Sequence, residues 1–236
     1  MRRFVPALVV FAAAGPLAGQ QPVAPYRFGW GDAASVTAAG VAFFLPGALG
    51  LPRGAPSCAP CDPATLWQLD RWAVHPVSSG ASAASSAGLA AIGGAALVFA
   101  LHDVSPAQAR GNAAVVANAL GWTAASTEWL KVVVRRKRPV LFTGGATAAA
   151  GDPNNQESFP SGHTSIAFAA ATSYAVLARR EHLDHGTRNA LLLYAGASGV
   201  GALRVAAGKH FPTDVVTGAL LGSALGWLVA RIHPTR

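Results

Sequence analysis

The sequence predicts an all-α fold, a helical bundle of about six core helices that is embedded in a membrane. Of the 236 residues, 52% are hydrophobic and 12% are charged, whereas soluble proteins average about 25% charged residues. Six apolar stretches contain no Lys, Arg, Asp or Glu, and no strand-like alternation competes with a helical interpretation. These stretches are 34–51, 83–101, 112–127, 163–178, 189–203 and 215–230.

The lengths of these stretches leave an alternative open. Most fall short of the roughly 20 residues that span a bilayer, so a soluble periplasmic helical domain is the alternative to the membrane-embedded bundle. Gly218 and Gly222 have the small-x3-small spacing found where membrane helices pack closely. Pro46 lies inside the first stretch, which either crosses the membrane, re-enters it or lies on its surface.

The N-terminus has the layout of a secretory signal. Two arginines follow Met1, a largely apolar run extends to Phe11, and small residues are frequent in 12–19. Residues 1–19 are therefore predicted to be a signal peptide or an uncleaved signal anchor. Residues 20–236 are predicted to form a single helical domain.

Cys58 and Cys61 are the two cysteines of the chain, and both lie in a Pro-rich segment. A structural zinc site needs four ligands, and a thioredoxin-type site needs a strand–helix setting that this segment does not offer. We therefore expect a local disulfide between Cys58 and Cys61, formed in an oxidising compartment.

The formal net charge of +8 favours an anionic partner. The basic residues form no stripe with interleaved aromatic residues, which disfavours nucleic acid. Phosphate compounds and anionic membranes remain as candidate partners.

The segment 158–164 reads Ser-Phe-Pro-Ser-Gly-His-Thr and leads directly into the apolar stretch 163–178. Pro160 and Gly162 disfavour a continuous helix through this segment, which places Ser161, Gly162 and His163 at a helix N-terminus. The unpaired backbone N–H groups at such a terminus form an anion site.

Two further blocks flank this turn, each beginning on a basic residue: Lys131-x6-Arg138-Pro139 upstream and Arg204-x5-His210-x3-Asp214 downstream. Together the three blocks resemble the type 2 phosphatidic acid phosphatase superfamily, whose pattern is Lys-x6-Arg-Pro, Pro-Ser-Gly-His and Ser-Arg-x5-His-x3-Asp. The resemblance covers about 131–214 and departs at Leu203, where the superfamily pattern has Ser.

The residue types in these blocks suit phosphoryl transfer. Lys131, Arg138 and Arg204 supply three cations for a phosphate dianion, and the guanidinium forks match paired phosphate oxygens. The backbone amides around Ser161 and Gly162, with the Ser161 hydroxyl, add donors to the same oxygens. These five residues are the predicted phosphate-binding set.

His210 and Asp214 are spaced for a histidine nucleophile. If Pro212 is the first helical residue, Asp214 lies in the first turn and can reach the imidazole, fixing its tautomer. The resemblance implies that His210 becomes phosphorylated, that Asp214 orients it and that His163 protonates the leaving oxygen. No further His-Glu cluster at ligand spacing supports a metal, so we expect chemistry that needs no metal and no cofactor.

If every stretch crosses the membrane, the three blocks and the cysteine segment fall on one side. The expected arrangement is then a bacterial-type inner membrane protein whose active site faces the periplasm and acts on a phosphorylated lipid. A soluble periplasmic domain would act on a small phosphomonoester instead. Arg135, Arg136 and Lys137 are interpreted as solvated surface charges.

Three other functions stay open. The superfamily also contains vanadium-dependent haloperoxidases, which are usually much larger. Ser161 could be the nucleophile of a Ser-His-Asp hydrolase, but 159–163 is not the Gly-x-Ser-x-Gly elbow and no strand precedes it. The bundle could also bind phosphate or lipid headgroups without catalysis.

Overall fold

The computed structural model describes residues 25–51 and 54–235. Within these ranges the chain forms six long helices: α1 (Trp30–Ala48), α3 (Ser79–Leu101), α4 (Pro106–Val134), α6 (Gly162–Arg180), α7 (Gly186–Ala206) and α8 (Pro212–Ile232). The connections contain the single-turn helices α2 (Gln68–Arg71) and α5 (Ala146–Ala149) and three 3-10 turns, Pro63–Thr65, Pro139–Phe142 and Pro153–Gln156. The described part of the chain contains no strand, so the predicted all-α bundle with six core helices is confirmed. The signal segment predicted for 1–19 lies outside the described residues.

α4 extends beyond its predicted stretch 112–127 at both ends. Ser105 caps its N-terminus, because the Ser105 hydroxyl accepts a hydrogen bond from the Gln108 amide at 3.3 Å. The helix ends where Arg135 adopts a left-handed backbone conformation with φ of 50°. The predicted stretch is shorter than the helix because charged residues bound it on both sides, Arg110 before it and Glu128 and Lys131 after it.

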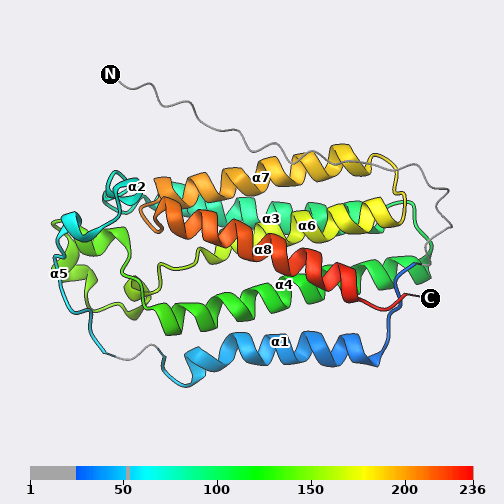
Figure 1. Ribbon diagram of the computed structural model, residues 1–236, viewed down its shortest axis with the longest axis horizontal. Helices are drawn as coiled ribbons and strands as arrows, with labels where there is room; N and C mark the ends of the chain where they lie inside the picture. The colour runs from blue at the N-terminus through cyan, green and yellow to red at the C-terminus, as the bar shows by residue number, and fades with distance from the viewer. Residues whose placement is uncertain (1–24, 52–53, 236) are drawn as a thin grey trace.

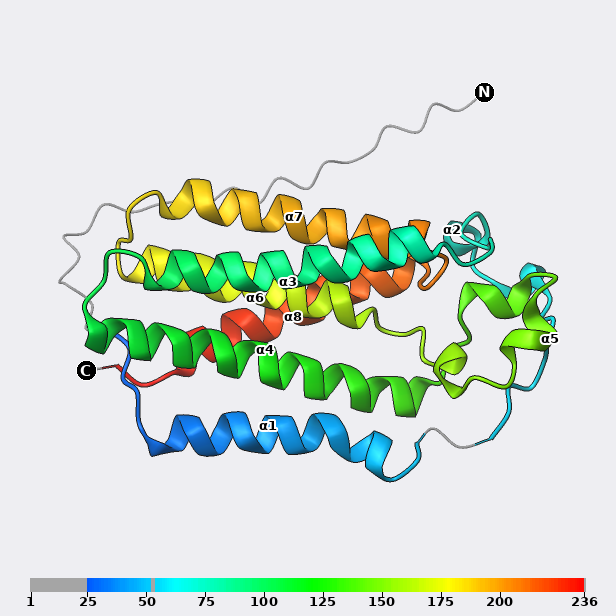
Figure 2. The same cartoon turned by 180° about the vertical axis from the view of Figure 1, so that it is seen from behind.

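α6 is the central helix of the bundle (Figures 1 and 2). It packs against α3, α4, α7 and α8, whereas α1 lies on the outside against α4. Most of its buried positions are small, including Ala167 and Ala171, and Tyr174 and Leu177 are the large buried side chains. Small side chains let these four helices approach α6 closely. One end of each of the four helices lies near the N-terminus of α6.

A row of glycines on α8 brings it against the α6 backbone. A Cβ atom on Gly222 would lie 1.9 Å from the carbonyl oxygen of Ser165, and one on Gly218 would lie 2.7 Å from that of Ser161. Gly226 continues the row one turn later, opposite Ala169. The close packing predicted from the spacing of Gly218 and Gly222 is thus confirmed.

All three sequence blocks lie at one end of the bundle, together with α2 and α5 (Figure 1). The α3–α4 and α6–α7 connections lie at the opposite end, where Tyr26 forms an isolated antiparallel bridge with Thr235. α1 is a continuous helix with Pro46 near its C-terminus, and it runs alongside α4 toward the end that carries the blocks. The one-sided placement that the sequence predicts for the blocks is therefore present in the fold.

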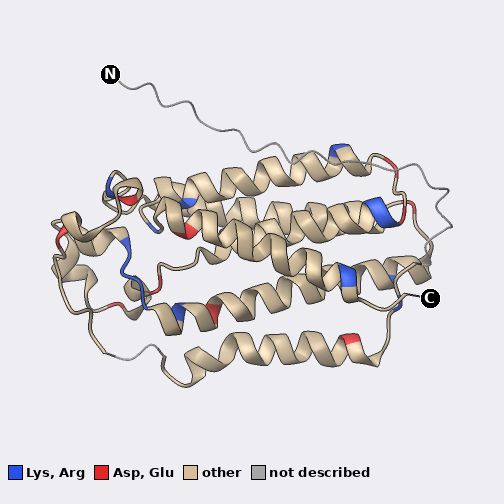
Figure 3. Ribbon diagram, in the orientation of Figure 1, with Lys and Arg blue, Asp and Glu red and all other residues tan. Residues whose placement is uncertain are grey.

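Charged residues lie near the ends of the bundle and leave its middle uncharged (Figure 3). Among the described helices, α3 and α8 are long enough and apolar enough to cross a membrane. Only 17% and 22% of their apolar windows are buried inside the protein. The other four long helices do not meet this criterion, so composition supports two of the six predicted crossings.

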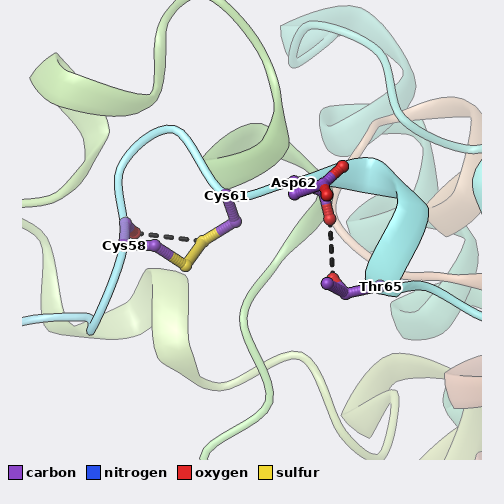
Figure 4. Close-up of a disulfide and its surroundings, with 4 residues drawn as sticks. All are labelled: Cys58, Cys61, Asp62 and Thr65. Atoms are coloured by element: carbon purple, nitrogen blue, oxygen red, sulfur yellow. Dashed lines mark hydrogen bonds between the residues drawn. A yellow bond between two sulfur atoms is a disulfide. The ribbon is translucent and has the colours of Figure 1, made fainter.

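Cys58 and Cys61 form a disulfide in the segment before α2 (Figure 4). The Cys61 amide donates to the carbonyl oxygen of Leu141 at 2.8 Å, which ties this segment to the 3-10 turn that begins at Pro139. The next residue, Asp62, accepts a hydrogen bond from the Ala64 amide at 2.8 Å and so begins the Pro63–Thr65 turn. The disulfide thus lies at the same end of the bundle as the sequence blocks.

Candidate active site

Four helix ends meet at the candidate site. Lys131 lies in the last turn of α4 and Arg204 in the last turn of α7, whereas His163 lies in the first turn of α6 and Asp214 in the first turn of α8. Helix N-termini favour negative charge, because their first amides lack intrahelical acceptors. The fold therefore brings the predicted residues together at a place suited to an anion.

His210 lies in the short connection between α7 and α8 and is only 2% exposed. Its Nδ1 lies 2.6 Å from the carbonyl oxygen of Ser158. A carbonyl oxygen only accepts, so Nδ1 carries the proton of the neutral ring and Nε2 keeps its lone pair. Nε2 has no hydrogen-bond partner among the described residues.

Burial lowers the pKa of His210 to about 3, and the cations of Arg138 and Arg204 act in the same direction. Asp214 opposes this shift without reversing it. The neutral imidazole with a free Nε2 is therefore the form present at neutral pH, as a nitrogen nucleophile requires.

Asp214 is completely buried beside His210. Its Oδ2 accepts hydrogen bonds from the Ser158 hydroxyl at 2.6 Å and from the Phe211 amide at 2.8 Å. The distance from this oxygen to Nδ1 of His210 is 3.8 Å, which is too long for a hydrogen bond. Asp214 neighbours the imidazole, as the spacing predicts, and Ser158 contacts both residues, through its hydroxyl to Asp214 and its carbonyl to the ring.

Two buried guanidinium groups at the site lack full complements of acceptors. Arg204 is 5% exposed, and its Nη1 contacts the Ser85 hydroxyl at 3.3 Å and the Ser82 hydroxyl at 3.5 Å. The Nε atoms of Arg204 and Arg138 are buried without any partner in the described structure. Burial lowers the pKa of both groups, and the pKa of Arg204, lowered to about 10, keeps that residue charged at neutral pH. A bound anion would supply the missing acceptors.

Lys131 completes the set of cations. It forms an ion pair with Glu128 at 2.6 Å, and its Nζ lies 3.8 Å from where a Cβ of Gly162 would be. The lysine thus lies beside the first residue of α6, at the helix end whose first amides lack intrahelical acceptors.

His163 faces α3, and its Nε2 lies 3.1 Å from the Ser86 hydroxyl. Burial lowers the pKa of His163 to about 4, and the charges of Arg204, Lys131 and Arg138 add to this shift in that order. All three predicted phosphate-binding cations therefore act electrostatically on this one ring. A bound phosphate would offset them and favour protonated His163.

The structure limits what Ser161 offers to an anion. Its amide donates to the backbone carbonyl oxygen of Asp214 at 3.1 Å, and its hydroxyl lies 2.9 Å from that of Thr164. The free amides of this terminus therefore begin at Gly162, and the Ser161 amide instead ties α6 to α8.

Sequence reasoning missed the serines of α3. Ser82 lies one turn before Ser85 and Ser86 on this helix, and the three side chains contact Arg204 or His163. A polar stripe at helical spacing in the first half of an otherwise apolar stretch is the signal that could have identified them.

The interpretation of Arg136 as a solvated surface charge is wrong. Its guanidinium group forms ion pairs with Asp70 at 2.7 Å and with Asp214, and it lies 4.6 Å from the centre of the Phe211 ring. Arg135 is exposed, as expected, and contacts Gln156. A run of basic residues in a sequence does not reveal which side chain is buried, because that depends on an acidic partner from a distant segment.

The described residues contain no group of three or more His, Cys, Asp or Glu side chains that could hold a metal ion. The metal-independent chemistry expected from the sequence stays a prediction.

The fold and the site together define an all-α protein with a buried histidine beside a candidate anion site built from helix termini and cations. The model of the PAP2 superfamily matches residues 112–236, and the chain belongs to this superfamily. It is also 32% identical over 119 residues to the lipid A 1-phosphatase of Porphyromonas gingivalis, a match that covers 46% of this chain and 25% of that protein. The aligned part is thus about a quarter of the length of this curated relative.

Proposed function

We propose that this protein is a metal-independent phosphatase that hydrolyses lipid phosphate monoesters or pyrophosphates through a phosphohistidine at His210. The observation that carries the proposal is the state of the His210 ring. Its Nδ1 is bound to the Ser158 carbonyl, its Nε2 has no partner in the described structure, and two incompletely paired guanidinium groups lie close by.

In the first step, Nε2 of His210 attacks phosphorus while the bond from phosphorus to the ester oxygen breaks. Protonated His163 gives its proton to that oxygen, so the alcohol leaves neutral. Lys131, Arg138, Arg204 and the first amides of α6 bind the equatorial oxygens throughout. In the second step, His163 takes a proton from water, whose oxygen attacks phosphorus and releases inorganic phosphate from His210.

A lipid substrate is supported by the surface of the bundle. The middle of the bundle carries no charged residues, and few residues in the apolar windows of α3 and α8 are buried inside the protein (Figure 3). Trp67 and Trp72 flank α2 at the site end and are 64% and 67% exposed, and Trp30 at the opposite end is 89% exposed. Tryptophans at both ends of an apolar bundle are typical of the two interfaces of a membrane.

The relative among curated proteins points to the same substrate class. That relative is a lipid A 1-phosphatase, named for a phosphorylated lipid, and the superfamily match includes His163, Arg204, His210 and Asp214. A site at the end of a membrane-embedded bundle lies level with lipid headgroups. We propose that this end faces the periplasm, the oxidising side on which the disulfide between Cys58 and Cys61 would form.

The test is phosphate release by the purified full-length protein in detergent micelles. A phosphorylated lipid and p-nitrophenyl phosphate are compared in the presence of a chelator, with His210→Ala as the inactive control. We expect chelator-resistant turnover of both substrates, a preference for the lipid, and inhibition by vanadate. Full activity of His210→Ala, or activity that the chelator abolishes, would refute the proposal.

A further inference from the structure

Asp70 is a buried carboxylate that contacts the candidate site from outside the matched region. It lies in α2 and is 1% exposed. Its Oδ2 accepts hydrogen bonds from Arg136 Nη2 and from the Thr213 hydroxyl, both at 2.7 Å, and its Oδ1 accepts from the Thr213 amide at 3.1 Å. Thr213 is the second residue of α8, so Asp70 binds the N-terminus of the helix that carries Asp214.

Arg136 connects Asp70 to Asp214. Its Nη1 donates to Asp214 Oδ1 and its Nη2 to Asp70 Oδ2, so one guanidinium fork holds both carboxylates. The backbone of the same residue also takes part, because its carbonyl oxygen accepts a hydrogen bond from the Ser158 amide at 2.8 Å. Arg136 therefore positions both groups that surround the Nδ1 side of His210.

The contacts form one chain from Asp70 to the imidazole. Asp70 holds Arg136, Arg136 holds Asp214, Asp214 accepts from the Ser158 hydroxyl, and the Ser158 carbonyl accepts from Nδ1 of His210. Two carboxylates and one guanidinium leave this cluster with one net negative charge. That charge favours a His210 ring that becomes cationic when Nε2 carries a phosphoryl group.

We propose that Asp70 and Arg136 are positioning residues for the reaction at His210, which they orient through Asp214 and Ser158. This inference rests on the proposed phosphohistidine function. Neither residue touches the anion position, so their loss should slow the chemical steps without weakening the binding of phosphate.

Asp70→Asn tests this with little change in shape, and Asp62→Asn, at an exposed carboxylate of the same segment, is the matched control. For Asp70→Asn we expect kcat for p-nitrophenyl phosphate to fall about tenfold to a hundredfold while KM and vanadate inhibition stay within about twofold. Arg136→Lys, which keeps the charge but loses the fork, should lose at least as much, with Arg135→Lys as its control. Unchanged kcat in Asp70→Asn, or a change confined to KM, would overturn the inference.

A double-mutant cycle with Ser158→Ala tests the path itself. If Asp70 acts through the Ser158 hydroxyl, the double variant should lose about as much kcat as the more severe single variant. Losses that multiply would show that Asp70 acts independently of this path and would contradict the inference.

A readout without turnover separates this inference from the proposed function. In the 15N-histidine NMR spectrum of the full-length protein in micelles, the Nδ1–H proton of His210 should exchange slowly with solvent. Exchange should become at least about tenfold faster in Asp70→Asn and Arg136→Lys, and it should not change in Asp62→Asn. Slow exchange retained in Asp70→Asn would overturn the inference, whether or not the wild-type protein hydrolyses any phosphate tested.

Discussion

Asp214 approaches Nδ1 of His210 to 3.8 Å without forming a hydrogen bond to it, and both residues are buried. The ring is bound instead by the Ser158 carbonyl, while the Asp214 carboxylate holds the Ser158 hydroxyl, the Phe211 amide and Arg136. The Asp214 carboxylate thus holds Ser158, whose carbonyl oxygen accepts the hydrogen bond from the histidine ring.

The first prediction concerns Asp214→Asn. The amide cannot pair with the Arg136 charge, and it presents one oxygen where the carboxylate presents two. We expect kcat for p-nitrophenyl phosphate to fall about a hundredfold or more, with KM changed much less. Asp152→Asn, at an exposed acid that caps a 3-10 turn, should keep wild-type kcat. Equal kcat values for the two variants would contradict this role of Asp214.

The second prediction concerns the contact between α6 and α8. A methyl group at Gly222 would collide with the Ser165 carbonyl, so Gly222→Ala must push the helices apart. We expect a loss of about 1–3 kcal/mol in the free energy of unfolding, seen as a lower thermal midpoint in detergent. Gly199→Ala on α7, which has open space around it, should not lower the midpoint. A midpoint for Gly222→Ala equal to that of Gly199→Ala would argue against the packing described.

The third prediction concerns pH. The pKa of free His163 is lowered to about 4, so the protonated acid becomes scarcer as pH rises above that value. His210, whose pKa is lowered to about 3, stays neutral over the same range. We therefore expect kcat/KM for an alkyl phosphate to fall with rising pH more steeply than that for p-nitrophenyl phosphate, whose leaving group needs no proton. In His163→Ala this difference should vanish, and identical wild-type profiles for the two substrates would count against His163 as the acid.

The fourth prediction concerns the tryptophans beside α2. If Trp67 and Trp72 lie in the membrane interface, replacing both by Ser should lower turnover of a phosphorylated lipid in vesicles roughly tenfold, since 1.4 kcal/mol of binding corresponds to that factor. Turnover of soluble p-nitrophenyl phosphate should not change. Trp30→Ser at the opposite end is the control, and equal losses on both substrates would contradict an interfacial role.

Much of this architecture could be predicted from sequence because the blocks lie at helix ends. Pro160 and Gly162 mark where α6 begins, Pro212 marks where α8 begins, and apolar stretches mark the helices between them. The relative placement of Lys131, His163 and Arg204 follows once the helices alternate in direction.

The supporting contacts of the site could not be predicted in the same way. Asp70 is one acid in a connection rich in tryptophan, and its partners Arg136 and Thr213 lie 66 and 143 residues away along the chain. Nothing local distinguishes Arg136 from Arg135, because the acidic partners of Arg136, Asp70 and Asp214, come from distant segments of the chain. The polar stripe of Ser82, Ser85 and Ser86 is visible in the sequence, but its role follows only once Arg204 and His163 are known to lie against it.

The central claim is that His210 becomes phosphorylated, and rapid acid-free quenching of the protein with a 32P-labelled phosphomonoester tests it most directly. The account predicts a phosphoenzyme that is labile in acid and stable in base, with the label mapped by mass spectrometry to the peptide containing His210. His163→Ala should accumulate this species with p-nitrophenyl phosphate, and His210→Ala should form none. A phosphoenzyme of the same yield in His210→Ala, or a label on Ser161, would contradict the account.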